Sequence, residues 1–129
     1  MDRVFLDANV PFSAAYRPDA GLVVLWRRPG AALLTSAYAV DEARRNLSED
    51  DQRQRLEALV RRCELVPSPA APLMPHGLAL PPDDQVIFLA AMTARATHLL
   101  TGDRTHFGPY YGRTIAGVLI LPPSVYLRG

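Results

Sequence analysis

The sequence predicts an α/β fold in which helices cover both faces of a central, mainly parallel sheet. Two observations support this prediction: short apolar segments of strand character recur along the chain, and longer segments of helical periodicity lie between them. Because parallel strands need crossover connections, which helices usually provide, the alternation favours a three-layer α/β/α sandwich.

The first half of the chain supplies two strands and four helical segments. Residues 3–7 form an apolar strand, after which Pro11 suits the first turn of a short helix. Residues 20–28 form a second helical segment that stops at a proline and a glycine, and residues 32–36 form a strand. A helix pair follows at 38–47 and 49–63, and the second helix places apolar side chains at i, i+3, i+4 and i+7: Leu56, Leu59, Val60 and Cys63.

The second half begins with a brief strand at Leu65 and Val66. Residues 67–82 contain six of the 12 prolines, so they are expected to connect elements without forming a helix or a central strand. The remaining expected elements are a helix from Asp83 or Asp84 to about Ala96, a strand at 98–101, a loop with Gly108, Pro109 and Gly112, a strand at 118–121 and a terminal helix from Pro123.

Length and composition are those of one globular domain spanning residues 1–129. The chain is 49% hydrophobic and 21% charged, and its apolar runs are shorter than the roughly 18 residues needed to span a bilayer. The N-terminus enters an apolar strand without a basic leader, so we expect a cytoplasmic protein with no membrane partner.

Charge and cysteine content exclude several classes of site. All 14 basic residues are arginines, so neither a P-loop lysine nor Schiff-base chemistry is available. The net charge of +1 does not by itself indicate a nucleic-acid binder. Cys63 is the single cysteine, which excludes an internal disulfide and a multi-thiolate zinc site.

Four acidic residues are expected at one edge of the sheet. Asp7 closes the first strand and Asp103 follows the strand at 98–101; if these strands are neighbours, both carboxylates leave the same edge. Asp84 opens the crossover helix before that strand, and such a helix begins at the same edge. Glu42 lies on a helix face that otherwise carries small residues and Asn46, so its carboxylate can approach another element closely.

Such a group of acids predicts a metal-dependent reaction. Carboxylates that converge without a lysine or histidine partner repel one another, and a hard divalent cation relieves this repulsion. Mg²⁺ or Mn²⁺ would polarise a phosphoryl oxygen and make a bound water more acidic, which points to phosphodiester hydrolysis.

Each acid also has a purely structural interpretation. Asp7 could cap the helix that follows it, and Asp83 with Asp84 could be an N-cap and a first-turn acid favoured by the helix dipole. Glu42 could be one solvated charge among several, and Asp103 could be an ordinary turn residue.

The order of these motifs, over nearly the whole chain, resembles the PIN-domain family, which includes the nuclease halves of VapBC-type toxin–antitoxin pairs. The motifs are Leu6-Asp7-Ala8-Asn9-Val10, the helical Glu42, Asp84 ahead of an alanine-rich helix, and Leu99-Leu100-Thr101-Gly102-Asp103.

The resemblance implies a Rossmann-like, PIN-like sandwich and an endoribonuclease that acts on single-stranded or structured RNA. It implies that Asp7, Glu42, Asp84 and Asp103 hold Mg²⁺ or Mn²⁺, and Asn9, Asn46 and Thr101 are expected to support them. An antitoxin that covers the acids with an arginine, and a homodimer, are further implications.

Two departures from the family pattern affect the site. The pair Asp83-Asp84 leaves the third acid ambiguous, and Asp84 is preferred for its spacing to Asp103. After Asp103, the chain continues with Arg104, Thr105 and His106 where many relatives have a further acid, which suggests a subgroup with its own substrate loop.

Four further residues are expected to bind substrate: Arg44, Arg104, His106 and Arg113. Arg104 and Arg113 flank a loop containing Tyr110 and Tyr111, and arginine beside aromatic rings suits a single strand. The tyrosines could equally pack this loop onto the body or form a dimer contact. His106 could bind a phosphate or a metal-bound water, or be a surface histidine without a ligand.

Two other functions remain open beside the nuclease. A catalytically silent PIN-like module could bind RNA or a protein, although such a module has no electrostatic reason to retain repelling acids. An aspartate-nucleophile phosphatase would need a second aspartate two residues after Asp7, where this chain has Asn9.

Overall fold

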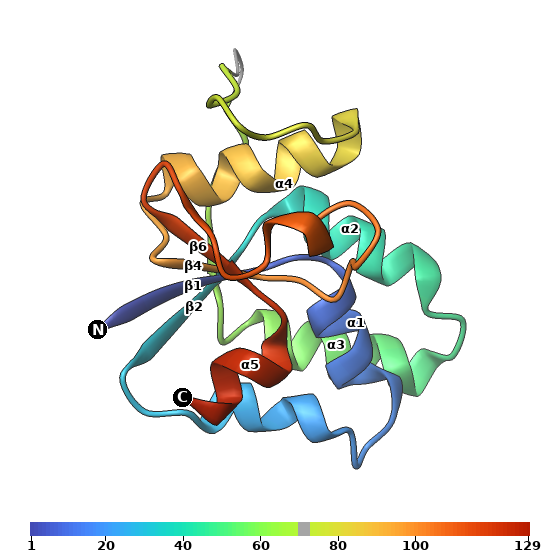
Figure 1. Cartoon of the computed structure of the whole chain (residues 1–129). Helices are drawn as coiled ribbons and strands as arrows, with labels where there is room; N and C mark the ends of the chain where they lie inside the picture. Colours follow the sequence, from blue (N-terminus) through green and yellow to red (C-terminus); the bar gives the residue numbers. More distant parts are fainter. Residues whose placement is uncertain (70–72) are drawn as a thin grey trace.

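The computed structural model describes residues 1–69 and 73–129, and its centre is one six-stranded sheet (Figure 1). The strand order is β3-β2-β1-β4-β6-β5, and every neighbouring pair is parallel except β5 with β6. The predicted, mainly parallel sheet is therefore confirmed. The strands are β1 (Asp2–Leu6), β2 (Ala31–Thr35), β3 (Glu64–Leu65), β4 (His98–Leu100), β5 (Thr114–Ile115) and β6 (Val118–Leu121).

Helices cover both faces of this sheet, which gives the expected three layers (Figure 1). Phe5 of β1 belongs to the apolar core with Phe88 of α4, whereas Leu6 packs on the opposite side with Val10 of α1 and Tyr126 of α5. The helices are α1 (Asn9–Tyr16), η1 (Gly21–Arg27), α2 (Ala37–Asn46), α3 (Asp50–Val60), α4 (Pro82–Thr93), η2 (Gly108–Tyr110) and α5 (Pro123–Arg128).

The direction of α4 determines which edge of the sheet its first turn reaches. Figure 1 shows α4 crossing the sheet from the edge where β1 and β4 end to the edge where β4 begins. Its first turn therefore lies at the carboxyl edge of the strands, as a right-handed crossover requires. Pro82 occupies the first turn, where the missing N–H of proline costs no helical hydrogen bond.

The structure corrects several predicted elements. Residues 21–27 form a 3₁₀ helix, which is typical of short segments. Helix α3 ends at Val60, and the N–H of Cys63 donates to the Val60 carbonyl in a tighter turn that follows it. The sequence reasoning missed β5. It pairs with β6 through a two-residue turn at Ala116 and Gly117, both with positive φ.

The expected connector at 67–82 forms no helix or strand in its described part before Pro82; residues 70–72 lie outside the described residues. The hydroxyl of Tyr110 accepts a hydrogen bond from the N–H of Ala79 at 2.9 Å, which fastens the later loop to this connector. Within the described ranges, no helix has the length and apolar character needed to cross a bilayer.

Candidate active site

Asp7 lies at the carboxyl end of β1, and its carboxylate is almost fully buried, with 4% of the residue exposed. The backbone N–H of Asp7 donates to the Leu100 carbonyl at 3.0 Å, so the ends of β1 and β4 are joined at this point. Oδ1 accepts the N–H of Ala8, and Oδ2 accepts the Thr101 hydroxyl at 2.7 Å. The carboxylate thus bonds to Ala8, the residue before α1, and to the neighbouring strand end; it does not cap the helix.

Asn9 and Thr101 form a rigid frame around Asp7. The Asn9 amide donates to Asp7 Oδ2 at 3.2 Å, and its Oδ1 accepts the N–H of Gly102 at 2.8 Å. The Thr101 hydroxyl donates to Asp7 and accepts the N–H of Asp103 at 3.1 Å. A Cβ at position 102 would lie only 3.3 Å from Asn9 Oδ1, so glycine permits this close approach.

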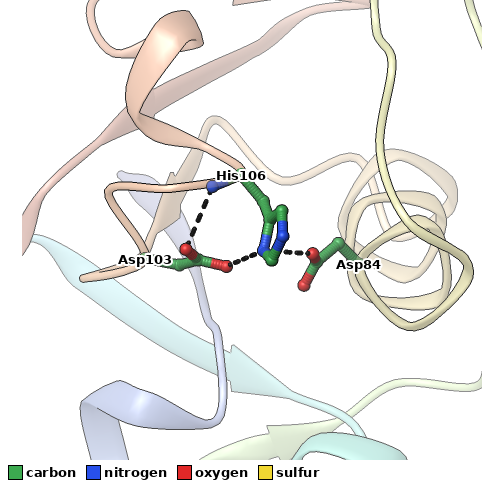
Figure 2. A group of neighbouring side chains, drawn as sticks. All are labelled: Asp84, Asp103 and His106. Atoms are coloured by element: carbon green, nitrogen blue, oxygen red, sulfur yellow. Dashed lines mark hydrogen bonds and ion pairs between the residues drawn. The ribbon is translucent and has the colours of Figure 1, made fainter.

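Asp103, His106 and Asp84 form a contiguous group beside this frame (Figure 2). His106 Nδ1 lies 2.9 Å from Asp103 Oδ2 and 3.2 Å from Asp84 Oδ2. Asp103 Oδ1 accepts the backbone N–H groups of Thr105 and His106, both at 3.1 Å. The acids at the end of β4 and at the start of α4 therefore meet through one imidazole.

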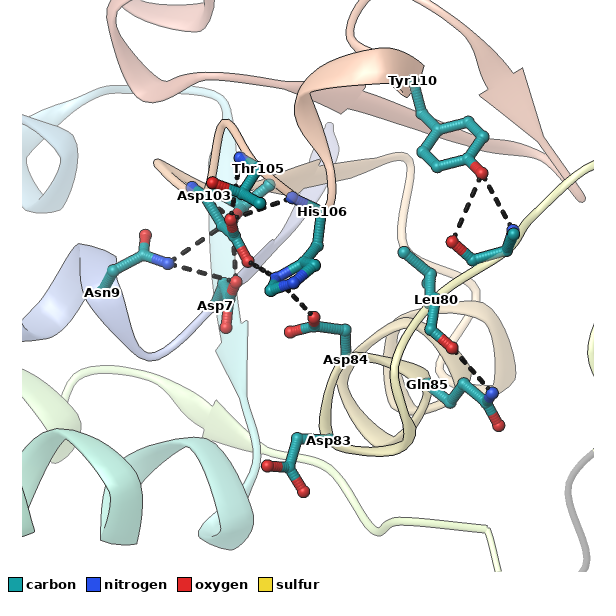
Figure 3. Close-up of polar contacts among 12 residues, drawn as sticks. Asp7, Asn9, Leu80, Asp83, Asp84, Gln85, Asp103, Thr105, His106 and Tyr110 are labelled. Atoms are coloured by element: carbon teal, nitrogen blue, oxygen red, sulfur yellow. Dashed lines mark hydrogen bonds and ion pairs between the residues drawn. The ribbon is translucent and has the colours of Figure 1, made fainter.

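Asp83 and Asp84 are directed to different partners. Figure 3 shows their side chains leaving the first turn of α4 in different directions, with Asp84 facing His106. Asp83 accepts the Tyr38 hydroxyl at 2.8 Å, and this hydrogen bond raises the pKa of Tyr38 to about 12. The geometry therefore associates Asp84, and not Asp83, with Asp103.

Glu42 contributes to the same electrostatic field from α2. Partial burial raises its pKa, and the negative charges of Asp7 and Asp83 raise it further, while Arg45 opposes them. Glu42 lines a surface hollow of about 320 Å³ together with Asn9 and Asn46. The Asn46 amide donates to the backbone carbonyl of Glu42 at 2.9 Å, so its direct contact is with the helix backbone.

The pKa shifts divide the acids into two kinds. Burial raises the pKa of Asp7 despite its hydrogen bonds, and burial followed by the charges of Asp103 and Asp7 raises that of Asp84. Partial burial also acts on Asp103, but the hydrogen bonds from His106 and Thr105 outweigh it and lower its pKa. The hydrogen bond to Asp103 in turn raises the pKa of His106.

The expected substrate-binding arginines have different surroundings. Arg44 bonds Glu57 at 2.6 Å and Asp41 at 2.7 Å, so it joins α2 to α3, and its predicted contact with substrate stays a prediction. Arg113 lies over the Tyr110 ring at 5.8 Å, beside the connector. Exposed Arg104 lines a second hollow, of about 360 Å³, with Asn9 and Gly102.

The sequence analysis named His106 as a candidate substrate ligand but did not predict its direct contact with two of the acids. The acids were expected to converge without a histidine partner, whereas His106 contacts two of them. The spacing of three residues after Asp103 was the available signal, since a turn can bring i and i+3 together. Both loop tyrosines make hydrogen bonds within the protein: Tyr111 donates to the Thr101 carbonyl at 2.7 Å, and Tyr110 accepts the N–H of Ala79 at 2.9 Å.

The donors at this site fit a divalent cation. Asp84, Asp103 and His106 each offer a ligand atom, and these atoms lie within 4.8 Å of one another. Carboxylate oxygens and an imidazole nitrogen are suitable ligands for such ions, and the neighbouring charges of Asp7 and Glu42 favour positive charge here.

Comparison with known proteins identifies the family. The family model described as PIN domain matches residues 3–105 of this chain. The chain belongs to the PIN domain family. PIN domains are generally nucleases, and PIN nucleases generally use divalent metals.

A solved structure shares the fold of this PIN domain. It is the crystal structure of VapBC2 from Rickettsia felis bound to a DNA fragment from their promoter, with a TM-score of 0.64 and 17% identity over 93% of this chain and 98% of that chain. The similarity supports the three-layer architecture. No curated protein matches the chain.

Proposed function

We propose that this PIN domain is a divalent-metal-dependent endoribonuclease that hydrolyses phosphodiester bonds in single-stranded RNA. The observation that supports it best is the convergence of Asp7, Asp84 and Asp103, which come from three separate elements, around one edge of the sheet (Figure 3). Burial first, and the neighbouring negative charges after it, raise the pKa values of Asp7 and Asp84, and a bound cation would favour their ionised forms.

The proposed ion is held by Asp84 and Asp103, with Asp7 and Glu42 completing the acidic environment. When bound, it supplies a Lewis acid at a phosphoryl oxygen and a more acidic water. The frame of Asn9 and Thr101 keeps the Asp7 carboxylate in one orientation through hydrogen bonds to Oδ2. The Glu42 carboxylate, whose pKa is raised by burial, is suited to accept a proton from the attacking water.

Two surface hollows, both lined by Asn9, would bind the nucleotides on either side of the cleaved bond. Phe12 lines the hollow beside Glu42, and Tyr111 with Arg104 lines the other. Aromatic rings can stack on unpaired bases, and an arginine can contact the phosphate. These features favour a single-stranded substrate, because its bases are free to enter the hollows.

We further propose that this nuclease is a VapC-like toxin, cytoplasmic, and partnered by an antitoxin. The fold shared with a VapBC complex supports this role. An arginine from the antitoxin would pair with Asp84 and Asp103 in place of the cation. A homodimer is part of the same proposal.

The neighbouring aspartates of α4 provide the test. The full chain is incubated with a single-stranded RNA oligonucleotide in Mn²⁺ or Mg²⁺, and Asp84→Asn is compared with Asp83→Asn. We expect cleavage by the wild type, loss of at least about 100-fold of the rate in Asp84→Asn, and near wild-type rates in Asp83→Asn.

Cleavage that continues in excess chelator, or at full rate in Asp84→Asn, would overturn the proposal. A wild type that binds RNA and the cation without cleaving any single-stranded RNA would instead support the silent binding module.

A further inference from the structure

We infer that His106 is a direct nitrogen ligand of the cation at this site, and that it makes the site prefer Mn²⁺ over Mg²⁺. The inference rests on the proposed function, because it concerns the ion that the nuclease would use. The loop from Asp103 to Gly108 would then supply a nitrogen ligand, which the acidic residues cannot supply.

The atomic spacing supports direct ligation. Adjacent ligand atoms on an octahedral ion, each about 2.1 Å from the metal, lie about 3.0 Å apart. His106 Nδ1 lies 2.9 Å from Asp103 Oδ2 and 3.2 Å from Asp84 Oδ2, close to that separation on both sides. Figure 2 shows the imidazole between the two carboxylates, with Nδ1 facing both.

The loop holds the backbone of His106 beside Asp103. The N–H groups of Phe107 and Gly108 both donate to the Asp103 carbonyl, and the N–H of His106 donates to the Asp103 carboxylate, all at 3.1 Å. Phe107, the residue after His106, is fully buried and anchors the turn in the core. The backbone of His106 is therefore held beside Asp103, and its imidazole contacts both Asp103 and Asp84.

The other histidines have different surroundings. His98 Nδ1 lies 2.8 Å from the Thr97 hydroxyl, and its ring packs edge-on against Tyr126 at 5.0 Å. His76 lies exposed in the connector. These two residues therefore serve as matched controls for the third.

Ligand chemistry determines the expected selectivity. Mg²⁺ favours oxygen ligands and retains water, whereas imidazole is a better ligand for transition-metal ions. Two carboxylates and one imidazole therefore favour Mn²⁺, which accepts oxygen ligands and ranks among the transition ions. The nitrogen is the feature that separates the two ions, since the carboxylates serve both.

The experiment detects the nitrogen directly. The full chain is loaded with Mn²⁺ and examined by pulsed electron paramagnetic resonance, in which a directly bound imidazole gives a ¹⁴N coupling to the ion. We expect this coupling in the wild type, in His76→Gln and in His98→Gln, and its loss in His106→Ala. Labelling the wild type with ¹⁵N-histidine should convert the signal to a ¹⁵N coupling without any substitution.

Affinity gives an independent measurement. We expect His106→Ala to weaken Mn²⁺ binding about tenfold or more while Mg²⁺ binding changes less than about threefold, as measured by titration calorimetry. Mn²⁺ bound without a histidine nitrogen coupling, or a coupling that persists in His106→Ala, would overturn the inference and leave the proposed nuclease intact. A wild type that binds neither ion would overturn both.

Discussion

The two ends of strand β1 carry aspartates in opposite environments. At the amino end, Asp2 accepts the Tyr126 hydroxyl at 2.8 Å, and the adjacent Arg3 pairs with Glu64 at 3.5 Å. At the carboxyl end, Asp7 is buried in a region where the nearby acids carry charge of the same sign. At the first end, Asp2 and Arg3 each have a partner of their own, whereas at the second end Asp84 and Asp103 share one histidine.

This difference indicates where the sheet can perform chemistry. Both ends have an aspartate, a tyrosine and a histidine nearby, so residue type alone does not distinguish them. The carboxyl end differs because the topology brings the start of α4 and the loop after β4 to the same place. This gathering of acids is the reason that we place the proposed cation site at the carboxyl end.

A comparison of Asp7→Asn with Asp2→Asn tests this contrast and should give the largest change in the rate of RNA cleavage. We expect Asp7→Asn to lower the rate of metal-dependent RNA cleavage by at least about 1000-fold, equivalent to about 4 kcal/mol, because the charge stabilising the cation is lost. Asp2→Asn should stay within about twofold of wild type. Comparable losses in both variants would show that the two ends do not differ in function.

The second prediction concerns stability within the site, where Asp84 and Asp103 should respond in opposite directions. In metal-free buffer near pH 7, we expect Asp84→Asn to raise the melting temperature and Asp103→Asn to lower it, each by roughly 2 to 5 °C. Burial and like charges make ionised Asp84 unfavourable in the fold, whereas hydrogen bonds stabilise ionised Asp103.

The pH dependence follows from the same shifts. A raised pKa means that Asp84 favours the folded state below its ordinary pKa of 3.8, and this contribution is lost as the pH rises through the raised value. The lowered pKa of Asp103 gives stability above 3.8 that is lost as the pH falls through the lowered value. In scanning calorimetry, the melting temperatures of Asp84→Asn and Asp103→Asn should therefore approach that of the wild type as the pH falls to about 3.

The smallest effects are expected for the arginines. Arg44→Gln should lower the unfolding free energy by up to about 1 kcal/mol, because its ion pairs are partly exposed, and leave the KM for RNA unchanged. Arg104→Gln should raise KM about threefold to tenfold with an unchanged melting temperature. A raised KM for Arg44→Gln would instead support the prediction that Arg44 binds substrate.

The sequence could predict the parts of the fold that follow from periodicity and chain direction. The parallel order of β1 and β4 and the return of α4 to their carboxyl ends brought Asp84 to Asp103, as expected from topology. Asn9 and Thr101 also lie beside Asp7, because both leave the same pair of strand ends.

Other features of the structure could not be predicted from the sequence, because they depend on how separate elements pack together. Arg44 meets Glu57 because α2 and α3 pack together, and local sequence shows only its neighbours Asp41 and Glu42. The position of His106 depends on a turn that is anchored by the buried side chain of the next residue, Phe107. Strand β5 has two residues, too few for an alternating pattern, and Ala116 gives a weaker turn signal than the usual asparagine.

The hydrogen-bonded turn from Asp103 to Gly108 requires a fixed number of residues. One residue accepts hydrogen bonds through both its carbonyl and its carboxylate from four successive N–H groups, those of Thr105, His106, Phe107 and Gly108. The exposed side chain of Thr105 accepts none of these hydrogen bonds and can be exchanged, but inserting or deleting a single residue would move His106 away from the aspartate. Libraries that diversify this loop should therefore keep its length constant.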